Sequence, residues 1–419
     1  MTRMRAMSKR PPTVESRSAL MRRLLHLAGL ALVSFSAPGS VAAQAQPDLT
    51  WHGEIRPRIL GREPVADQWD HWISMRTRLG LAGRFDEGIG FFVQLQDVRF
   101  WGEEYGTRDA SADALDIHQA YLEVESVPGA GGTARAGRQE FHMAEGRLIA
   151  SPRWGQAGQS FDGVRWTRPF GDAKVDFVYF RTREGSAGRH DSSADLTAAW
   201  LTLPTTSLGS LDFVAVHDRS DEPEGTGQST LGSIWKGTSG PFSFRAQGMY
   251  QFGERAGSDV SAFMVAAAGT ASLAGGKASV SLWYDHLSGD DRLGDGETGA
   301  FSTLFAARHR YYGRGDYFRD IPQDTGSLGL RDAAIKLAAI PTPLLRLNLD
   351  FHTFRTTECG SLSSRHLAEE IDLWVSYRFR EVMNLEAGYS LTWAGTAMEE
   401  LGRLEGTGHM TYLMTSVLF

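Results

Sequence analysis

Long runs of strictly alternating apolar and polar residues constrain this 419-residue chain more than any other feature of its sequence. In residues 371–379, Ile, Leu, Val, Tyr and Phe alternate with Asp, Trp, Ser and Arg, and residues 345–351 and 385–393 repeat the pattern. A repeat of two residues is the period of a β-strand, whereas a helix repeats every three to four residues. The sequence therefore predicts an all-β fold.

The length and number of these runs favour a membrane barrel over a soluble sandwich. Each run covers about 10–15 residues, against roughly 5–6 for strands in soluble folds, and about eighteen runs can be counted, with sixteen as the alternative. Short links such as 239–241 alternate with long ones such as 60–71, 142–160, 288–328 and 395–408. This alternation predicts a transmembrane, antiparallel, up-and-down β-barrel in a bacterial outer membrane, with short periplasmic turns and long extracellular loops.

The N-terminal residues have the layout of a signal peptide. Arg22 and Arg23 precede an apolar stretch, residues 24–37, and small residues follow it. A membrane-spanning helix needs ~20 apolar residues, so a cleaved signal over residues 1–43 is favoured over an anchor helix. We expect cleavage after Ala43 or Ala45, with Met21 as an alternative translation start, and a barrel domain over residues 48–419.

The C-terminal run ends on an aromatic residue, Phe419. We expect residues 409–419 to be the closing strand and to pair with the first strand near residues 49–60, because an open sheet edge in hydrocarbon would leave backbone groups unpaired. A terminal Phe on an alternating strand also resembles the signal by which barrel proteins are recognised for assembly. The expected partners are therefore the barrel-assembly machinery and the outer-membrane lipid, including lipopolysaccharide.

Charge and motifs exclude several classes of function. The formal charge is −7, and removing residues 1–43, which hold seven basic residues and one acidic residue, moves it to −13. An acidic exported protein is a poor nucleic-acid binder. The single cysteine, Cys359, permits neither an internal disulfide nor a cysteine-based metal site. No GxSxG, HExxH or Walker pattern occurs, so we expect no enzyme activity and no cofactor.

One acidic loop is a calcium candidate. Asp290, Asp291 and Asp295 lie close together in the sequence, but their spacing is not that of an EF-hand. A solvated acidic loop is the favoured alternative, and no metal is predicted.

The polar face of the alternating runs carries a surplus of basic side chains. Placing that face toward the lumen gives a set of pore-lining candidates for binding the solute: Arg56, Arg58, Arg76, Arg78, Arg135, Arg165, Arg245, Lys336, Arg346 and Arg378. Guanidinium groups bind carboxylates bidentately, and rings of Arg pass anions. The alternative, weighed about equally, is that these residues pair with inward acids and brace the wall.

Several motifs resemble those of the alginate export family of outer-membrane proteins. They are LQDVRFWGEE (95–104), AGRQEFHMAEGRLI (136–149), WGQAGQSFDGVRW (154–166), WYDHLSGDD (283–291) and FSTLFAARHRYYGRGDYF (301–318). The resemblance implies a monomeric, eighteen-stranded barrel with an Arg-lined conduit for a polyuronate. The chain is shorter than such exporters can be, so reduced loops and a reduced plug are expected.

Two groups within these motifs are candidates for the extracellular end. Asp97, Arg99, Arg138, Gln139 and Asp162 are expected at one rim, where a charge network would fix the 142–160 loop; this structural role is favoured over ligand contact. Residues 301–318 form an aromatic-rich stretch that we expect to fold over or into the barrel mouth. Its candidate residues are His309, Tyr311, Tyr312 and Asp316. It would either stack on sugar rings or, as favoured, pack on itself.

These observations predict an outer-membrane channel for an anionic polysaccharide, oligosaccharide or small organic anion. A substrate-specific or general uptake porin is the first alternative. A plugged barrel with a structural or adhesive role is the second.

Overall fold

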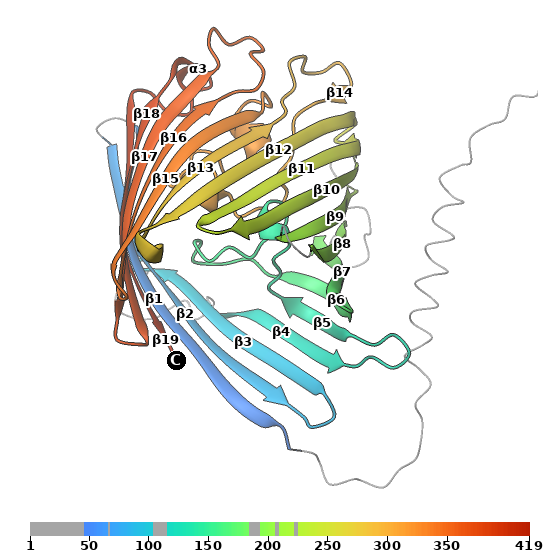
Figure 1. The fold of residues 1–419 in the computed structure, drawn as a ribbon. Coiled ribbons are helices and arrows are strands. Elements are labelled where there is room, and N and C mark those ends of the chain that lie inside the picture. The colour runs from blue at the N-terminus through green and yellow to red at the C-terminus, as the bar shows by residue number, and fades with distance from the viewer. Residues whose placement is uncertain (1–45, 66–67, 104–114, 184–192, 206–208, 222–224) are drawn as a thin grey trace, which may run out of the picture. The chain divides into compact units, whose positions relative to one another are not determined.

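Eighteen long strands close into one antiparallel β-barrel in the computed structural model, which describes residues 46–65, 68–103, 115–183, 193–205, 209–221 and 225–419 (Figure 1). The predicted signal peptide, its alternative start and its cleavage sites lie outside these residues. The barrel strands, in chain order, are β1 (Asp48–Val65), β2 (Gln68–Arg84), β3 (Ile89–Phe100), β4 (Leu115–Glu125), β5 (Thr133–Gln139), β6 (Phe161–Phe170), β7 (Ala173–Arg183), β8 (Ala194–Thr205), β9 (Gly209–Ser220), β10 (Thr226–Ser239), β11 (Phe242–Arg255), β12 (Ser258–Leu273), β13 (Ala278–Leu287), β15 (Leu330–Thr342), β16 (Leu345–Arg355), β17 (His366–Phe379), β18 (Met383–Ala394) and β19 (Thr407–Leu418).

The remaining elements are short and lie in the links. Strand β14 (Glu297–Thr298) pairs in parallel with β12, and helices α2 (Ile321–Asp324) and α3 (Thr396–Glu400) each make about one turn. None of the helices in the described part of the chain has the length and apolarity needed to cross a membrane.

The last strand closes the barrel against the first, as the alternating C-terminal run predicts. Strand β19 pairs antiparallel with β1, from Glu54 opposite Leu418 to Glu63 opposite His409. Phe419 extends this ladder: its amide and carbonyl both bond to the backbone of Gly53, and its ring leaves no room for a side chain there. Closure pairs every barrel strand on both sides, which is what a sheet in hydrocarbon requires.

The outer face carries the apolar half of each alternating run. Large apolar side chains such as Leu122 and Leu282, each 62% exposed, point away from the lumen. Aromatic residues gather near the ends of the strands, for example Trp51, Phe170 and Phe242 toward the periplasmic ends. An apolar band bounded by aromatic residues is the surface that a bilayer solvates.

One expected loop is wrong. Residues 60–71 are not a long link, because β1 continues to Val65 and β2 begins at Gln68. The ladder simply extends, with Leu60 opposite Trp72 and Arg62 opposite Asp70. Charged residues in this extension break the alternating pattern, since a strand that rises beyond the membrane no longer needs an apolar outer face.

The inner face has two unlike halves. On β7 to β12 many inward side chains are apolar and buried, including Phe180, Leu196, Val214, Ile234 and Met264. On β1 to β3 and β13 to β17 the inward side chains are mostly polar or charged. The apolar half belongs to the main hydrophobic core, which also includes residues of the long links. The barrel therefore has a packed side and a polar side.

Candidate functional site

Two long links fold into the barrel and meet there. The first inserted segment, residues 140–160, joins β5 to β6, and the second, residues 288–329, joins β13 to β15. Ile149 pairs with Phe305 in a parallel bridge, and the Ala307 amide donates to the Gly146 carbonyl over 2.9 Å. The first segment contacts β1 and β2 as well as β13, strands far apart in the sheet, so it crosses the lumen.

Arg147 anchors both inserted segments to the wall. Its guanidinium donates two hydrogen bonds, of 2.5 and 2.9 Å, to Asp285 of β13, and the two side chains are 0% and 2% exposed. It also donates to the Tyr312 hydroxyl over 3.1 Å and lies 3.7 Å from the centre of the Tyr311 ring. Burial alone would lower the pKa of Arg147, but the Asp285 carboxylate outweighs burial and raises it, so the group stays charged.

An unusual turn aims Arg147 at its partner. Ala144, Glu145 and Gly146 have φ values of +46°, +68° and +77°, a left-handed conformation that non-glycine residues adopt rarely. The Glu145 carboxylate lies 3.4 Å from the amine of Lys236 and 3.5 Å from the guanidinium of Arg310. These contacts help to hold the turn, which presents Arg147 to the wall.

Two cavities in the polar half of the lumen lie against the inserted segments. The lower cavity has a volume of 820 Å³ and reaches Ser279, Ala338 and Arg346, near the periplasmic turns. The upper cavity has a volume of 610 Å³ and reaches Arg62 and Phe100, near the extracellular ends of β1 and β3. Both volumes lie in the range of about 300–1,000 Å³ that is usual for small-molecule sites.

Both cavities are lined by more basic than acidic side chains. The lower cavity has five basic residues and three acidic ones: Arg153, Arg310, Arg314, Lys336 and Arg346 against Glu140, Asp350 and Asp372. The upper cavity has four and one: Arg58, Arg62, Arg308 and Arg319 against Asp316. The lumen around these two cavities is thus locally basic in a chain whose formal charge is −7.

Trp154 and His309 separate the two cavities, since both residues line both of them. Their rings stack with centroids 3.8 Å apart and planes 6° from parallel. The two oxygens of Asp316 join the pair: the Trp154 indole donates over 3.0 Å to one, and His309 Nδ1 lies 2.7 Å from the other. Arg58 covers the Trp154 ring at 4.6 Å. We call Trp154, His309 and Asp316 the divider.

The protonation states of the divider follow from its burial. Burial lowers the pKa of His309, so its imidazole is neutral at pH 7 and donates its one proton at Nδ1 to Asp316. Burial would raise the pKa of Asp316, but His309 and the hydrogen bond from Trp154 outweigh it and hold the pKa below its usual value. Asp316 is therefore a buried carboxylate held by two aromatic N–H donors.

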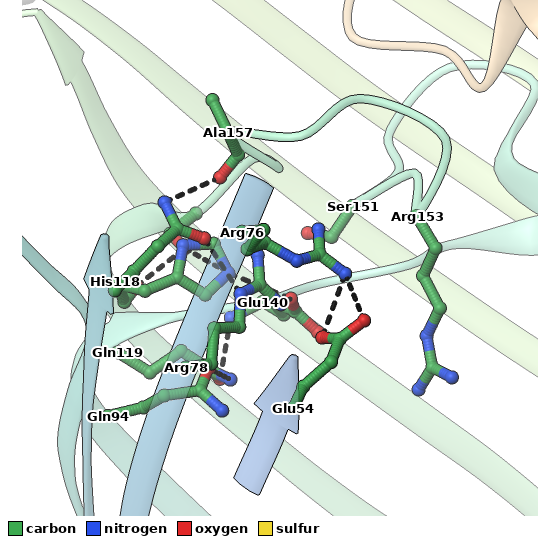
Figure 2. A network of polar contacts seen from close by, with 12 residues as sticks. Glu54, Arg76, Arg78, Gln94, His118, Gln119, Glu140, Ser151, Arg153 and Ala157 are labelled. Carbon is green, nitrogen blue, oxygen red and sulfur yellow. Dashed lines mark hydrogen bonds and ion pairs between the residues drawn. The ribbon is translucent and has the colours of Figure 1, made fainter. Parts of the chain in front are cut away.

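Three of the predicted pore-lining residues hold the first inserted segment. Arg56 donates to the carbonyls of Arg153 and Gly155, and Arg58 and Arg76 donate to neighbouring carbonyls in residues 154–156. All three side chains are buried. One guanidinium nitrogen of Arg76 also donates to both carboxylate oxygens of Glu54, at 2.7 and 2.8 Å (Figure 2). Backbone carbonyls of the inserted segment thus accept the guanidinium N–H groups for which the adjacent strands supply no carboxylate.

Arg78 joins a second polar group on the same wall. It donates to Gln96 over 2.7 Å and pairs with Glu140 at 3.1 Å, while His118 lies 2.8 Å from the same carboxylate. Burial would raise the pKa of Glu140, but His118 and Arg78 outweigh it and lower the pKa. In Figure 2 no dashed interaction reaches the Arg153 side chain, and none of its contacts within the described ranges is with an acid.

The other predicted pore-lining residues divide into braced and exposed groups. Three pair with acids on a neighbouring strand: Arg135 with Glu123, Arg165 with Asp176, and Lys336 with Asp350. Arg245 lies 4.5 Å from the Trp283 ring and 4.0 Å from Glu145. Arg346 is exposed in the lower cavity and donates to Asn348. Arg378 is exposed near the end of β17 and lines neither cavity.

The predicted rim residues form pairs on the outer face. Asp97 and Arg99 make a bidentate pair, and so do Arg138 and Asp162. Their outward direction follows from the register, since Val98, next to Arg99, lies opposite the inward Arg76. These four side chains therefore do not reach the 142–160 loop from inside. Gln139 alone is buried and bonds to the Gly137 and Gly163 carbonyls.

The expected mouth loop lies inside the barrel. Tyr311 and Tyr312 are 0% and 1% exposed and pack around Arg147, while His309 and Asp316 belong to the divider. The acidic loop is different: Asp291 and Asp295 lie 3.6 and 3.8 Å from Arg292, and Asp290 caps the same turn. Among the described residues no group of three such side chains is arranged to hold a metal ion.

Sequence reasoning missed residues that hold the two inserted segments to each other or to the wall. Arg147, Trp154 and Arg314 stand in no alternating run, so the period-two pattern assigns them no face. Arg314 lies 3.7 Å from the Trp374 ring and donates to Tyr412 over 2.9 Å. The sequence signal that could have found them is the high density of aromatic and basic residues within the long links. A loop that is simply solvated does not need such residues, so their density indicates a link that packs inside the barrel.

Comparison with known proteins places the chain among outer-membrane barrels. A family model described as alginate export matches residues 58–406. Comparison with curated proteins gives no match. Similar solved structures include OpdO of Pseudomonas aeruginosa (12% identity, 89% of this chain and 97% of that one, TM-score 0.64) and OprD of the same organism (13%, 90% and 95%, 0.61). OccAB1 of Acinetobacter baumannii is also similar (14%, 91% and 99%, 0.59).

At these identities the solved structures support the fold alone, and the family match extends over most of the barrel. The closed barrel, the apolar outer band and the cavities in the lumen agree with that match. The chain belongs to the alginate export family and is a bacterial outer-membrane β-barrel channel.

Proposed function

We propose that this channel passes an anionic saccharide or small organic anion through the polar half of its lumen. The observation that carries the proposal is the basic lining of both cavities, above all Arg153 and Arg346, whose contacts in the described part of the chain include no acid. A narrow, low-dielectric passage weights nearby charges far above distant ones. Exterior acids are screened over ~10 Å at 0.1 M salt.

The lower cavity also supports the saccharide part of the proposal. Trp283 and Trp374 line it together with the basic residues. Indole faces pack against the apolar faces of sugar rings, while guanidinium groups bind carboxylates. A uronic acid offers both features at once. A neutral sugar offers only the first.

The proposed role is passive transport rather than catalysis. A passive channel moves its solute down the concentration gradient, so the same lining serves export and uptake. The uptake porin therefore remains the second candidate, favoured by the size of the cavities, which suits a small solute. The direction in the cell would follow from which side supplies the anion.

Block of the ion current tests the proposal. In planar bilayers with KCl, glucuronate should reduce the current of the refolded protein in a concentration-dependent way, and glucose, which lacks the carboxylate, should not. Arg346→Gln should raise the half-blocking concentration about threefold to tenfold, equivalent to roughly 0.6–1.4 kcal/mol. Arg378→Gln is the matched control, because that exposed residue lines neither cavity. Equal effects of glucuronate and glucose would refute the proposal.

A further inference from the structure

The divider contains a carboxylate that no strand supplies. Asp316 comes from the second inserted segment, yet its side chain is only 14% exposed and both oxygens are engaged, one by Trp154 and one by His309. Its backbone has a φ of +58°, a left-handed conformation that Asp tolerates better than most residues. The backbone thus turns sharply to place a carboxylate between two cavities that are lined by more basic than acidic side chains.

The surroundings of Asp316 form a site for a carboxylate. Two aromatic N–H groups point at its oxygens, and Arg58 lies against the Trp154 ring on which His309 stacks. Arg319 lines the upper cavity beside it, and Arg314 lies 3.5 Å from the second nitrogen of His309. Any solute carboxylate that moves between the cavities meets these same donors and cations.

We propose that Asp316 is a tethered occupant of a carboxylate-binding site, and that the carboxylate of the passing solute replaces it and so opens the divider. This inference rests on the proposed function and names its solute as a monomeric or short oligomeric carboxylic acid. When the solute takes the N–H donors of Trp154 and His309, Asp316 loses its partners and the stacked rings are free to separate. When the solute leaves, Asp316 returns and the divider closes.

The way the segments are held limits how far the divider opens. Phe141, Met143, Ala144, Leu148 and Ile149 belong to the buried core, and the Arg147–Asp285 pair fixes this part of the segment. Residues 151–158 are held mainly by guanidinium bonds to backbone carbonyls from β1 and β2, and several of them are exposed to the cavities. Trp154 therefore moves with the 151–158 stretch while the rest stays in place. Such a local movement admits a small solute and not a polymer threaded through the whole lumen.

The test compares refolded full-length variants in planar bilayers. Asp316→Ala removes the tethered carboxylate and leaves its donors, so the variant should show a higher open conductance and a half-blocking glucuronate concentration at least tenfold lower than wild type. Trp154→Phe keeps a stacking ring but removes one N–H donor, so it should raise the conductance and weaken the glucuronate block. Asp291→Ala, an exposed acid outside both cavities, is the control and should change neither value.

The outcomes separate this inference from the proposed function. If glucuronate blocks wild type but Asp316→Ala has wild-type conductance and wild-type block, the tethered-carboxylate inference is wrong and the proposed function stands. If glucuronate blocks no form of the channel, the proposed function itself is wrong. A hexameric uronate that crosses the wild-type channel as readily as the monomer would also overturn the inference. Should Asp316→Ala fail to fold, unchanged behaviour of Trp154→Phe would overturn it instead.

Discussion

Replacing Arg147 by Met should release the inserted segments while leaving the barrel closed. The side chain is fully buried, bonds twice to Asp285 and contacts the rings of Tyr311 and Tyr312. Met has a similar length and no charge, so the substitution removes the ion pair and leaves little empty space. The barrel strands pair through their backbones and do not depend on this contact.

The expected cost follows from the burial of the pair. Removing one partner of a buried ion pair leaves the other charge unpaired and costs about 3–5 kcal/mol. At about 1.4 kcal/mol per factor of ten, local opening of the first inserted segment should become roughly two to three and a half orders of magnitude more frequent. An exposed pair is a fair comparison, because such pairs contribute only about 0–1 kcal/mol.

Amide hydrogen exchange measures this opening directly. The amides of Met143 and Gly146 are bonded within the segment, to carbonyls 3.0 and 2.8 Å away, and should exchange faster in Arg147→Met by the factor given above. Peptides from β11 and β12 should be unchanged. Arg84→Met, which breaks an exposed pair with Glu125, is the matched control. An acceleration below tenfold would show that the Arg147–Asp285 pair does not hold the segment.

Three further outcomes are expected. Epitope tags within residues 291–297, all of which are exposed, should be reached from outside intact cells and tags at 239–241 should not; the reverse would invert the topology. Deleting Phe419 should lower the amount of heat-modifiable barrel in the outer membrane, since two backbone bonds of the closing ladder are lost, and unchanged assembly would contradict this role. Arg56→Ala combined with Arg76→Ala should raise the open conductance by freeing the 151–158 stretch, and a wild-type conductance would refute the holding role.

The barrel itself was predictable because the bilayer imposes a simple rule. Strands whose outer face meets lipid must alternate, and a closed sheet must join its last strand to its first. Alternation is complete in the runs 371–379 and 385–393, and the closing strand ends at Phe419. The inward direction of Arg56 and Arg76 follows from the same alternation.

The contents of the lumen were not predictable from alternation. The sequence pattern of a polar inward residue is the same whether its side chain contacts water or the carbonyls of an inserted segment. The role of Arg56 in holding that segment could therefore not be distinguished from pore lining. The prediction that the rim pairs fix the 142–160 loop was wrong for a related reason. Beyond the hydrocarbon region, a charged pair such as Arg99 with Asp97 is tolerated on the outer face of the barrel. Predictions about lipopolysaccharide and assembly partners stay predictions.

One sequence signal did mark the packed half of the lumen. Residues 262–268 are apolar on both faces of their strand, which a water-facing lumen would not require. In the structure Ala262 and Met264 face inward into the main hydrophobic core. A barrel strand that is apolar on both faces therefore indicates that something packs inside.

The zero-current potential of the reconstituted channel across a KCl gradient tests the central claim most directly. The basic lining of both cavities predicts a potential whose sign is set by the chloride gradient, although the whole chain is acidic. A potential whose sign is set by the potassium gradient would contradict an anion channel.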